Sequence, residues 1–316
     1  NDVALSVDMS GQVTFFAADT GKEILTPQLS LPEGSAITSF SSGDATTGIL
    51  SYGFDNGQVL LFKREYKISY PDDKRKITPF ISYPLGQESI QVDPKGRRVS
   101  LLSVQSNDEQ SSFAALTENN SLVLQSTIRE QDFLDEDAFT LTTQIGEIDL
   151  SEFGEITHME MDIDQRELYI VNRKGFIAYY DIQNIEQARL IQQIKAVPHG
   201  VDITTLEFLT GGISILVGRS DGQIDQWFPV RGEDNNTILH NVRSFKEQSA
   251  AIIQIEPEYA RKGFIALDQT GDFGIYHTTA HRTLLVEPLS DHANVKMALS
   301  PRANGLLSLA IDGKAK

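Results

Sequence analysis

The stretch Arg219-Ser220-Asp221-Gly222-Gln223-Ile224-Asp225-Gln226-Trp227 decides the fold, because it reads as a tight turn between two β-strands. An apolar strand, Ile213 to Val217, precedes the turn, and an amphipathic strand leaves it. Gly222 supplies the positive φ that other residues resist in such a hairpin. The same arrangement recurs along the chain around Gly11, Gly57, Asn120, Gly175, Gly222, Gly271 and Gly313. We predict that these seven residues are the structural turns of a repeat protein.

The repeat length predicts the architecture. Successive turn residues are separated by 46, 63, 55, 47, 49 and 42 positions, and periods of about 40–50 with four short strands are typical of propeller blades. Five residues after the turn, five of the six complete copies are aromatic and Gln125 is the exception; the aromatic residues are Phe16, Phe62, Tyr180, Trp227 and Tyr276. We expect these rings to pack between neighbouring sheets.

The strands that enter the turns are nearly continuous apolar runs, which is expected when both faces of a sheet are covered. A second strand is predicted upstream of six turns, at Ile37–Phe40, Ile90–Val92, Ile156–Met161, Ile203–Phe208, Ile252–Ile255 and Val295–Leu299. The fold class is therefore an all-β propeller of WD40-like four-stranded blades. Seven blades are favoured, and six or eight follow if one weak repeat is miscounted. Residues 1–316 are expected to form a single propeller domain.

Composition excludes several functions. The net charge of −17 argues against sequence-independent binding to nucleic acid, whose phosphates would be repelled. Cysteine is absent, which excludes disulfides, thiol catalysis and cysteine-ligated zinc. No apolar run of about 20 residues is present that could span a bilayer.

No motif of a common enzyme class is present, so no catalytic, cofactor-binding or metal-binding residue is predicted. His277 and His281 have the most metal-like spacing, but residues four apart on a strand are roughly 13 Å apart, too far to share an ion without a turn. We keep His277, His281 and Arg282 as candidate partner or ligand contacts. The densest acidic group, Asp132, Asp135, Glu136 and Asp137, is interpreted as a solvated loop.

Two segments resemble a known family. Ala260-Arg261-Lys262-Gly263-Phe264-Ile265-Ala266-Leu267-Asp268 and His277-Thr278-Thr279-Ala280-His281-Arg282-Thr283-Leu284-Leu285 are similar to long-form phosphate ABC transporter permeases. Ile77-Thr78-Pro79 through Tyr83-Pro84 is similar to the same family. The resemblance covers the large extracytoplasmic insert of these permeases. It implies a domain excised from a longer protein of the bacterial inner membrane, exposed to the periplasm.

Three functions follow as hypotheses. The leading one is a non-enzymatic interaction or regulatory domain for phosphate import, whose partners would be other transporter subunits or the periplasmic phosphate-binding protein. The alternative is a free-standing scaffold propeller for protein–protein interaction, since the hairpin from Asp221 to Trp227 matches WD40 repeats in register. The third is a hydrolase or a dehydrogenase with its site in the central channel.

Overall fold

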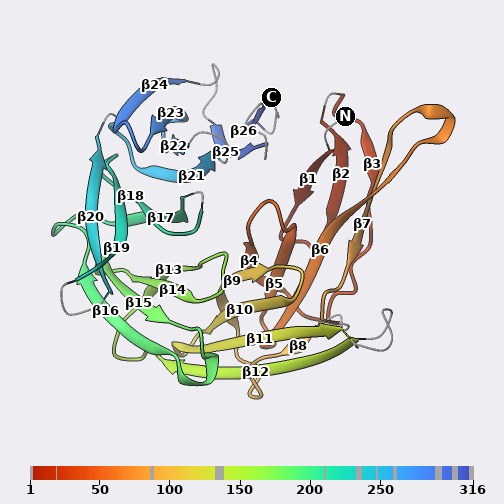
Figure 1. Ribbon diagram of the computed structural model, residues 1–316, viewed down its shortest axis with the longest axis horizontal. Helices are drawn as coiled ribbons and strands as arrows, with labels where there is room; N and C mark the ends of the chain where they lie inside the picture. The colour runs from red at the N-terminus through yellow and green to blue at the C-terminus, as the bar shows by residue number, and fades with distance from the viewer. Residues whose placement is uncertain are drawn as a thin grey trace. The chain divides into compact units, whose positions relative to one another are not determined.

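The chain folds into antiparallel β-sheets, each formed by strands that follow one another in the sequence (Figure 1). The computed structural model describes residues 3–18, 20–85, 89–131, 139–209, 211–232, 237–246, 248–258, 262–288, 294–300 and 305–312. Within these ranges no helix is long and apolar enough to cross a membrane. The chain divides into two compact units, Asn1–Glu152 with Asn184–Ala188 and Phe153–Gln183 with Arg189–Lys316.

The first unit contains three blades. Blade 1 has strands β1 (Val3–Val7), β2 (Val13–Ala17) and β3 (Glu23–Leu25). Blade 2 has β4 (Ile37–Ser42), β5 (Ile49–Phe54), β6 (Gln58–Ser69), β7 (Lys76–Ser82) and β8 (Ile90–Gln91), and blade 3 has β9 (Val99–Ser106), β10 (Gln110–Thr117), β11 (Ser121–Gln131) and β12 (Phe139–Asp149). Two one-turn 3₁₀ segments, η1 (Pro71–Asp73) and η2 (Ile185–Gln187), belong to the same unit.

The second unit also contains three blades. Blade 4 has β13 (Ile156–Met161), β14 (Glu167–Asn172), β15 (Phe176–Asp181) and β16 (Arg189–Lys195); blade 5 has β17 (Ile203–Phe208), β18 (Ile215–Arg219), β19 (Ile224–Arg231) and β20 (Thr237–Phe245). Blade 6 has β21 (Ile252–Glu258), β22 (Gly263–Asp268), β23 (Asp272–His277) and β24 (Arg282–Pro288). Strands β25 (Asn294–Leu299) and β26 (Leu306–Ala310) form a separate two-stranded sheet.

The described residues therefore form six blades, not the seven favoured from the sequence. A turn signal specifies only the strands beside it, and in the seventh repeat the described residues form just two strands, β25 and β26, which pair with each other. A second prediction was also wrong. Ile90–Val92 is not the inner strand of blade 3: Ile90 and Gln91 form β8, which pairs with Val59 and Gln58 of β6 in blade 2.

Side chains alternate between the two faces of each blade, so that both faces are buried. On β5, Leu50, Tyr52 and Phe54 pack toward blade 1, while Ile49 packs toward blade 3. On β18, Ile215 and Val217 pack with blade 4 and Leu216 packs with blade 6. This two-sided burial explains why these strands read as continuous apolar runs.

The inner strands of blades 2 to 6, and β25, each carry one extra residue that does not pair with the neighbouring strand, a β-bulge. In blades 2 to 6 the extra residues are Thr38, Ser100, Thr157, Thr204 and Ile253, and Val295 is the equivalent residue on β25. Side chains at or beside the bulges bind the next inner strand of the same unit. Thr38 Oγ1 donates to the Val99 carbonyl at 2.6 Å, and Gln254 Nε2 donates to the Met297 carbonyl at 2.7 Å. These bonds join successive blades at their inner strands.

Candidate functional site

The structure places His277, His281 and Arg282 around the turn between β23 and β24, but it does not bring them to a common site. His277 Nδ1 accepts the Ala280 N–H at 3.2 Å. His281 Nε2 lies 2.9 Å from the Ser244 carbonyl on β20, and its ring packs edge-to-face on Phe245 at 5.0 Å. The two histidines thus bind different groups, and His281 joins blade 6 to blade 5.

Arg282 is exposed and lies opposite His277 in the strand register. Among the residues that the structure describes, no three His, Asp or Glu side chains form a group able to hold a metal ion. The acidic residues 132 and 135–137 lie outside the described part of the chain.

The turn residues have the left-handed backbone that the sequence pattern requires, with φ between 59° and 92° at Gly11, Gly57, Asn120, Gly175, Gly222 and Gly271. Gly313 lies outside the described residues. At Gly222 the absence of a side chain is also required. A Cβ on Gly222 would lie 2.2 Å from the Gln248 carbonyl oxygen, so the loop that leaves blade 5 packs directly on this turn.

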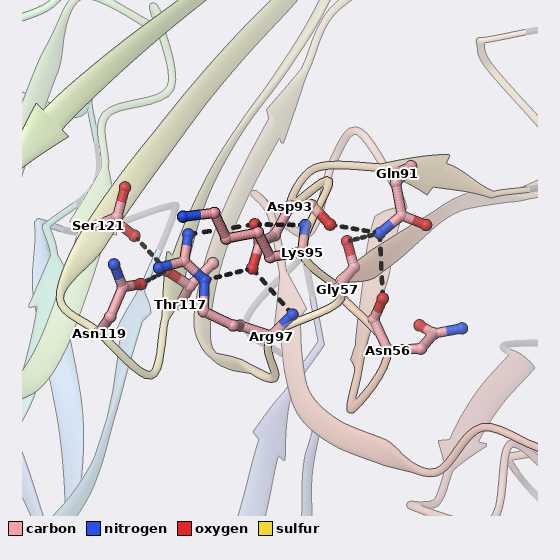
Figure 2. Close-up of polar contacts among 9 residues, drawn as sticks. All are labelled: Asn56, Gly57, Gln91, Asp93, Lys95, Arg97, Thr117, Asn119 and Ser121. Carbon is pink, nitrogen blue, oxygen red and sulfur yellow. Dashed lines mark hydrogen bonds and ion pairs between the residues drawn. The ribbon is translucent and has the colours of Figure 1, made fainter.

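A set of polar contacts among Gly57, Asp93, Lys95 and Arg97, here called the polar latch, holds the Gly57 turn (Figure 2). The Gly57 carbonyl accepts the Val92 N–H at 3.0 Å and the Asp93 N–H at 3.2 Å. The Asp93 carboxylate accepts two backbone N–H groups, from Lys95 at 3.1 Å and Arg97 at 2.8 Å, and binds the Arg97 guanidinium at 2.7 Å. The Arg97 side-chain hydrogen bond lowers the pKa of Asp93 to about 2. Asp93 is therefore a fixed anion and not a proton carrier near neutral pH.

The Asp162 carboxylate accepts backbone N–H groups in its turn as Asp93 does, but its pKa is shifted in the opposite direction. Its oxygen accepts the N–H groups of Arg166 at 2.7 Å and Glu167 at 2.6 Å. Burial raises the pKa of Asp162 to about 6, and the nearby carboxylates of Glu167 and Asp164 act in the same direction. Both oxygens are engaged by backbone donors, which indicates a structural role.

A buried ion-pair network holds the turn between β18 and β19, at residues 219–225. Arg219 Nη1 donates to Asp225 at 3.0 Å, and its Nε donates to Asp221 at 3.0 Å. Asp225 is completely buried and also accepts hydrogen bonds from Gln223 Nε2 at 2.7 Å and Ser244 Oγ. Every polar atom of Asp225 thus has a partner, as a buried carboxylate requires.

A pocket of about 150 Å³ lies in blade 6 beside Glu258 and His277, and its other lining residues are Gly263, Phe264, Ile265, Ile275, Tyr276, Leu284 and Leu299. Small-molecule sites usually measure about 300–1,000 Å³. The pocket is thus too small for a typical cofactor.

The outer strands carry apolar side chains at one repeated position, exposed in three of four blades and, at Ile191, partly buried against the core. Opposite the aromatic residue of four blades, the outer strand has a bulge whose extra residue is apolar: Ile24, Ile191, Val242 and Leu284. Leu284 is 61% exposed, and Ile24 and Val242 are each 42% exposed. The sequence predicted the aromatic residues but not this apolar position facing them.

The β6–β7 hairpin is the second apolar surface. β6 pairs with β5 as far as Lys63, and the Arg64 N–H still donates to the Gly48 carbonyl at 2.9 Å. The last five residues of β6, Glu65–Ser69, pair with β7 alone and extend beyond the blade (Figure 1). Ile68 is 49% exposed and Tyr70 is 66% exposed. At the base of the hairpin, Pro79 is buried and the Tyr66 ring packs edge-to-face on Phe15 at 6.4 Å. The hairpin is therefore anchored at its base and exposed at its tip.

Comparisons with known proteins identify the fold class. No protein-family profile matches the chain, and no curated protein matches it. The β-propeller domain of Cps50 (Swd1) from Myceliophteria thermophila aligns over 99% of this chain and 90% of its own, at 15% identity and a TM-score of 0.62. The chain is an all-β propeller of four-stranded antiparallel blades with WD40-like structural neighbours.

Two further solved structures are similar at the same level. One is a chain of the mitotic checkpoint complex, with 15% identity, 96% of this chain and 80% of that chain covered, and a TM-score of 0.58. The other is Sqt1 of Chaetomium thermophilum bound to the N-terminus of ribosomal protein L10, with 15% identity, 99% and 79% covered, and a TM-score of 0.58. At this identity the likeness establishes the fold.

Proposed function

We propose that this protein is a scaffold for protein–protein interaction without catalytic activity of its own. One observation carries the proposal: large apolar side chains remain exposed at the outer-strand bulges and on the β6–β7 hairpin, whereas the perturbed carboxylates are engaged in turns and ion pairs. Exposed apolar side chains gathered on one element are typical of docking surfaces. Two of the structural neighbours were solved in a complex or with a bound peptide, which supports the same function.

Chemical cross-linking in cells of the source organism, followed by mass spectrometry, tests the scaffold function. The cross-linked protein is then purified, and its affinity for the intact chain is measured by calorimetry. We expect a defined stoichiometry and a micromolar or tighter Kd, as interfaces of moderate size give. If no purified candidate binds, or if the chain turns over a substrate, the scaffold proposal is wrong.

We propose phosphate import as a second candidate, in which the scaffold is the periplasmic insert of a transporter permease. The resemblance of residues 260–268 and 277–285 supports it, and those of these residues that the structure describes form the core strands of blade 6 and its turn to β24. The complete open reading frame tests this setting: flanking membrane spans are expected. Calorimetry with the phosphate-loaded binding protein tests the partner, and a flat titration at high micromolar concentration would count against it.

A further inference from the structure

The β6–β7 hairpin has a charge opposite to that of the rest of the protein. Residues 63–82 contain six basic residues (Lys63, Arg64, Lys67, Lys74, Arg75 and Lys76) and three acidic residues (Glu65, Asp72 and Asp73), a net charge of +3. The remaining residues then total −20, because the whole chain has a charge of −17. A local basic patch on an acidic protein selects anionic partners through electrostatic complementarity.

Four of the six basic residues of the hairpin are exposed, and three of these, Lys74, Arg75 and Lys76, lie at its tip. Lys67, Lys74, Arg75 and Lys76 are all exposed, and among the described residues the ion pairs formed are elsewhere in the chain. Asp72 and Asp73 both have positive φ, 52° and 57°, so the tip is a tight left-handed turn that places the three basic residues next to the start of β7.

An apolar row runs along one face of the same hairpin. The register sets Tyr66 opposite Pro79 and Ile68 opposite Ile77, and residues directly opposite in an antiparallel pair share a face. Tyr70 continues this row toward the tip and is the most exposed aromatic residue described. From Glu65 to Ser69 the strand is about 17 Å long, which matches an extended peptide of about five residues.

We propose that the β6–β7 hairpin is a docking arm for an acidic segment of a partner protein. The carboxylates of the segment pair with Lys74, Arg75 and Lys76, and its apolar side chains cover Ile68 and Tyr70. The inference rests on the proposed scaffold function and names the chemistry of the partner. Because the base of the hairpin is packed against blade 1, little ordering is needed on binding, which favours affinity.

Fluorescence anisotropy with the intact chain tests the arm. The probe is a labelled peptide of about 12 residues that alternates Glu with Leu and Phe, long enough to cover the strand, and a Lys-for-Glu peptide is the control. We expect the acidic peptide to bind the wild type with a micromolar Kd and more weakly as salt rises. The triple variant K74E/R75E/K76E is expected to bind roughly tenfold more weakly, and Tyr70→Ser is expected to weaken binding at all salt concentrations.

The triple variant K22E/K174E/K246E is the matched control, since it changes the net charge equally at three exposed lysines elsewhere. Equal weakening in both triple variants, or no binding of the acidic peptide, would overturn the proposal. So would binding to vesicles with about one third phosphatidylserine in preference to the peptide. If the cross-linked partner binds the wild type and K74E/R75E/K76E equally, the docking-arm proposal is wrong, while the proposed scaffold function is unaffected.

Discussion

Replacing Asp93 with Asn tests whether the polar latch stabilises the first unit through charge. Asn keeps the size of the side chain, but its single acceptor oxygen can serve the N–H of Lys95 or of Arg97 and not both, and it removes the carboxylate that binds the Arg97 guanidinium. Lowering the pKa of Asp93 from its ordinary 3.8 to about 2 corresponds to about 2.5 kcal/mol. Water around the partly exposed Arg97 side chain reduces this to about 1–2 kcal/mol.

The sign of the pH dependence follows from the direction of the pKa change. Because the pKa of Asp93 is lower in the folded than in the unfolded protein, its stabilisation is complete above about pH 5 and is lost as the pH falls from about 4 toward 2. Urea denaturation followed by circular dichroism measures the free energy of unfolding of wild type and Asp93→Asn at each pH. We expect the difference to be largest at pH 7 and to shrink below pH 4.

The exposed Asp108 is the control, since Asp108→Asn makes the same charge change away from the latch, and we expect it to alter the free energy of unfolding by less than about 0.5 kcal/mol. If Asp93→Asn matches the Asp108 control at pH 7, or if its effect is the same at pH 3 as at pH 7, the electrostatic account of the latch is refuted.

Three further substitutions test the packing and the histidine turn. Asp225→Ala should cost about 3 kcal/mol in urea denaturation, because it leaves the buried Arg219 guanidinium with one carboxylate partner fewer; a change below about 1 kcal/mol would contradict this. Gly146→Ala should lower the melting temperature, since its Cβ would lie 1.9 Å from the Ile185 carbonyl oxygen; an unchanged melting temperature would show that η2 moves freely. His281→Ala should destabilise by about 1 kcal/mol through the lost bond to β20, and a change in zinc affinity instead would indicate a metal site.

The hairpin turns were predictable because a positive φ restricts the residue type at one position. Gly57, Gly175 and Gly222 carry that signal locally, and their backbone angles agree with it. The aromatic position was also predictable from the local pattern: Phe62, Tyr180, Trp227 and Tyr276 are buried, whereas Phe16 is only half-buried. Patterns of this kind depend on only a few neighbouring residues.

The exception at Gln125 has a structural explanation that the sequence did not supply. Gln125 is buried and lies near Thr127 in blade 3, where its amide approaches the threonine hydroxyl at 3.5 Å. Thr127 Oγ1 in turn lies 3.1 Å from Thr143 Oγ1 on β12. A row of polar side chains, Gln125, Thr127 and Thr143, thus takes the place of the aromatic ring of the other blades, and it depends on a partner strand that the repeat pattern does not display.

The strand at Ile90–Gln91 could not be assigned from its own residues. An apolar run before a proline is typical of an inner strand, but pairing depends on which strand edge is open. β7 pairs with β6 only as far back as Lys63, which leaves Gln58 and Val59 without an outer partner, and β8 pairs with them. The exposure of the β6–β7 hairpin could not be predicted either, because it depends on how far β6 extends beyond its pairing with β5.

The most direct test of the central claim, that this propeller is a docking scaffold with the β6–β7 hairpin as its arm, is site-specific photo-cross-linking in cells. A photoreactive phenylalanine replaces Tyr70 in one variant and the exposed Lys174 in another. We predict one dominant cross-linked protein from position 70, with an acidic segment at the linked peptide, and little from position 174. Equal yields from both positions, or a cross-link at position 70 to lipid alone, would contradict the account.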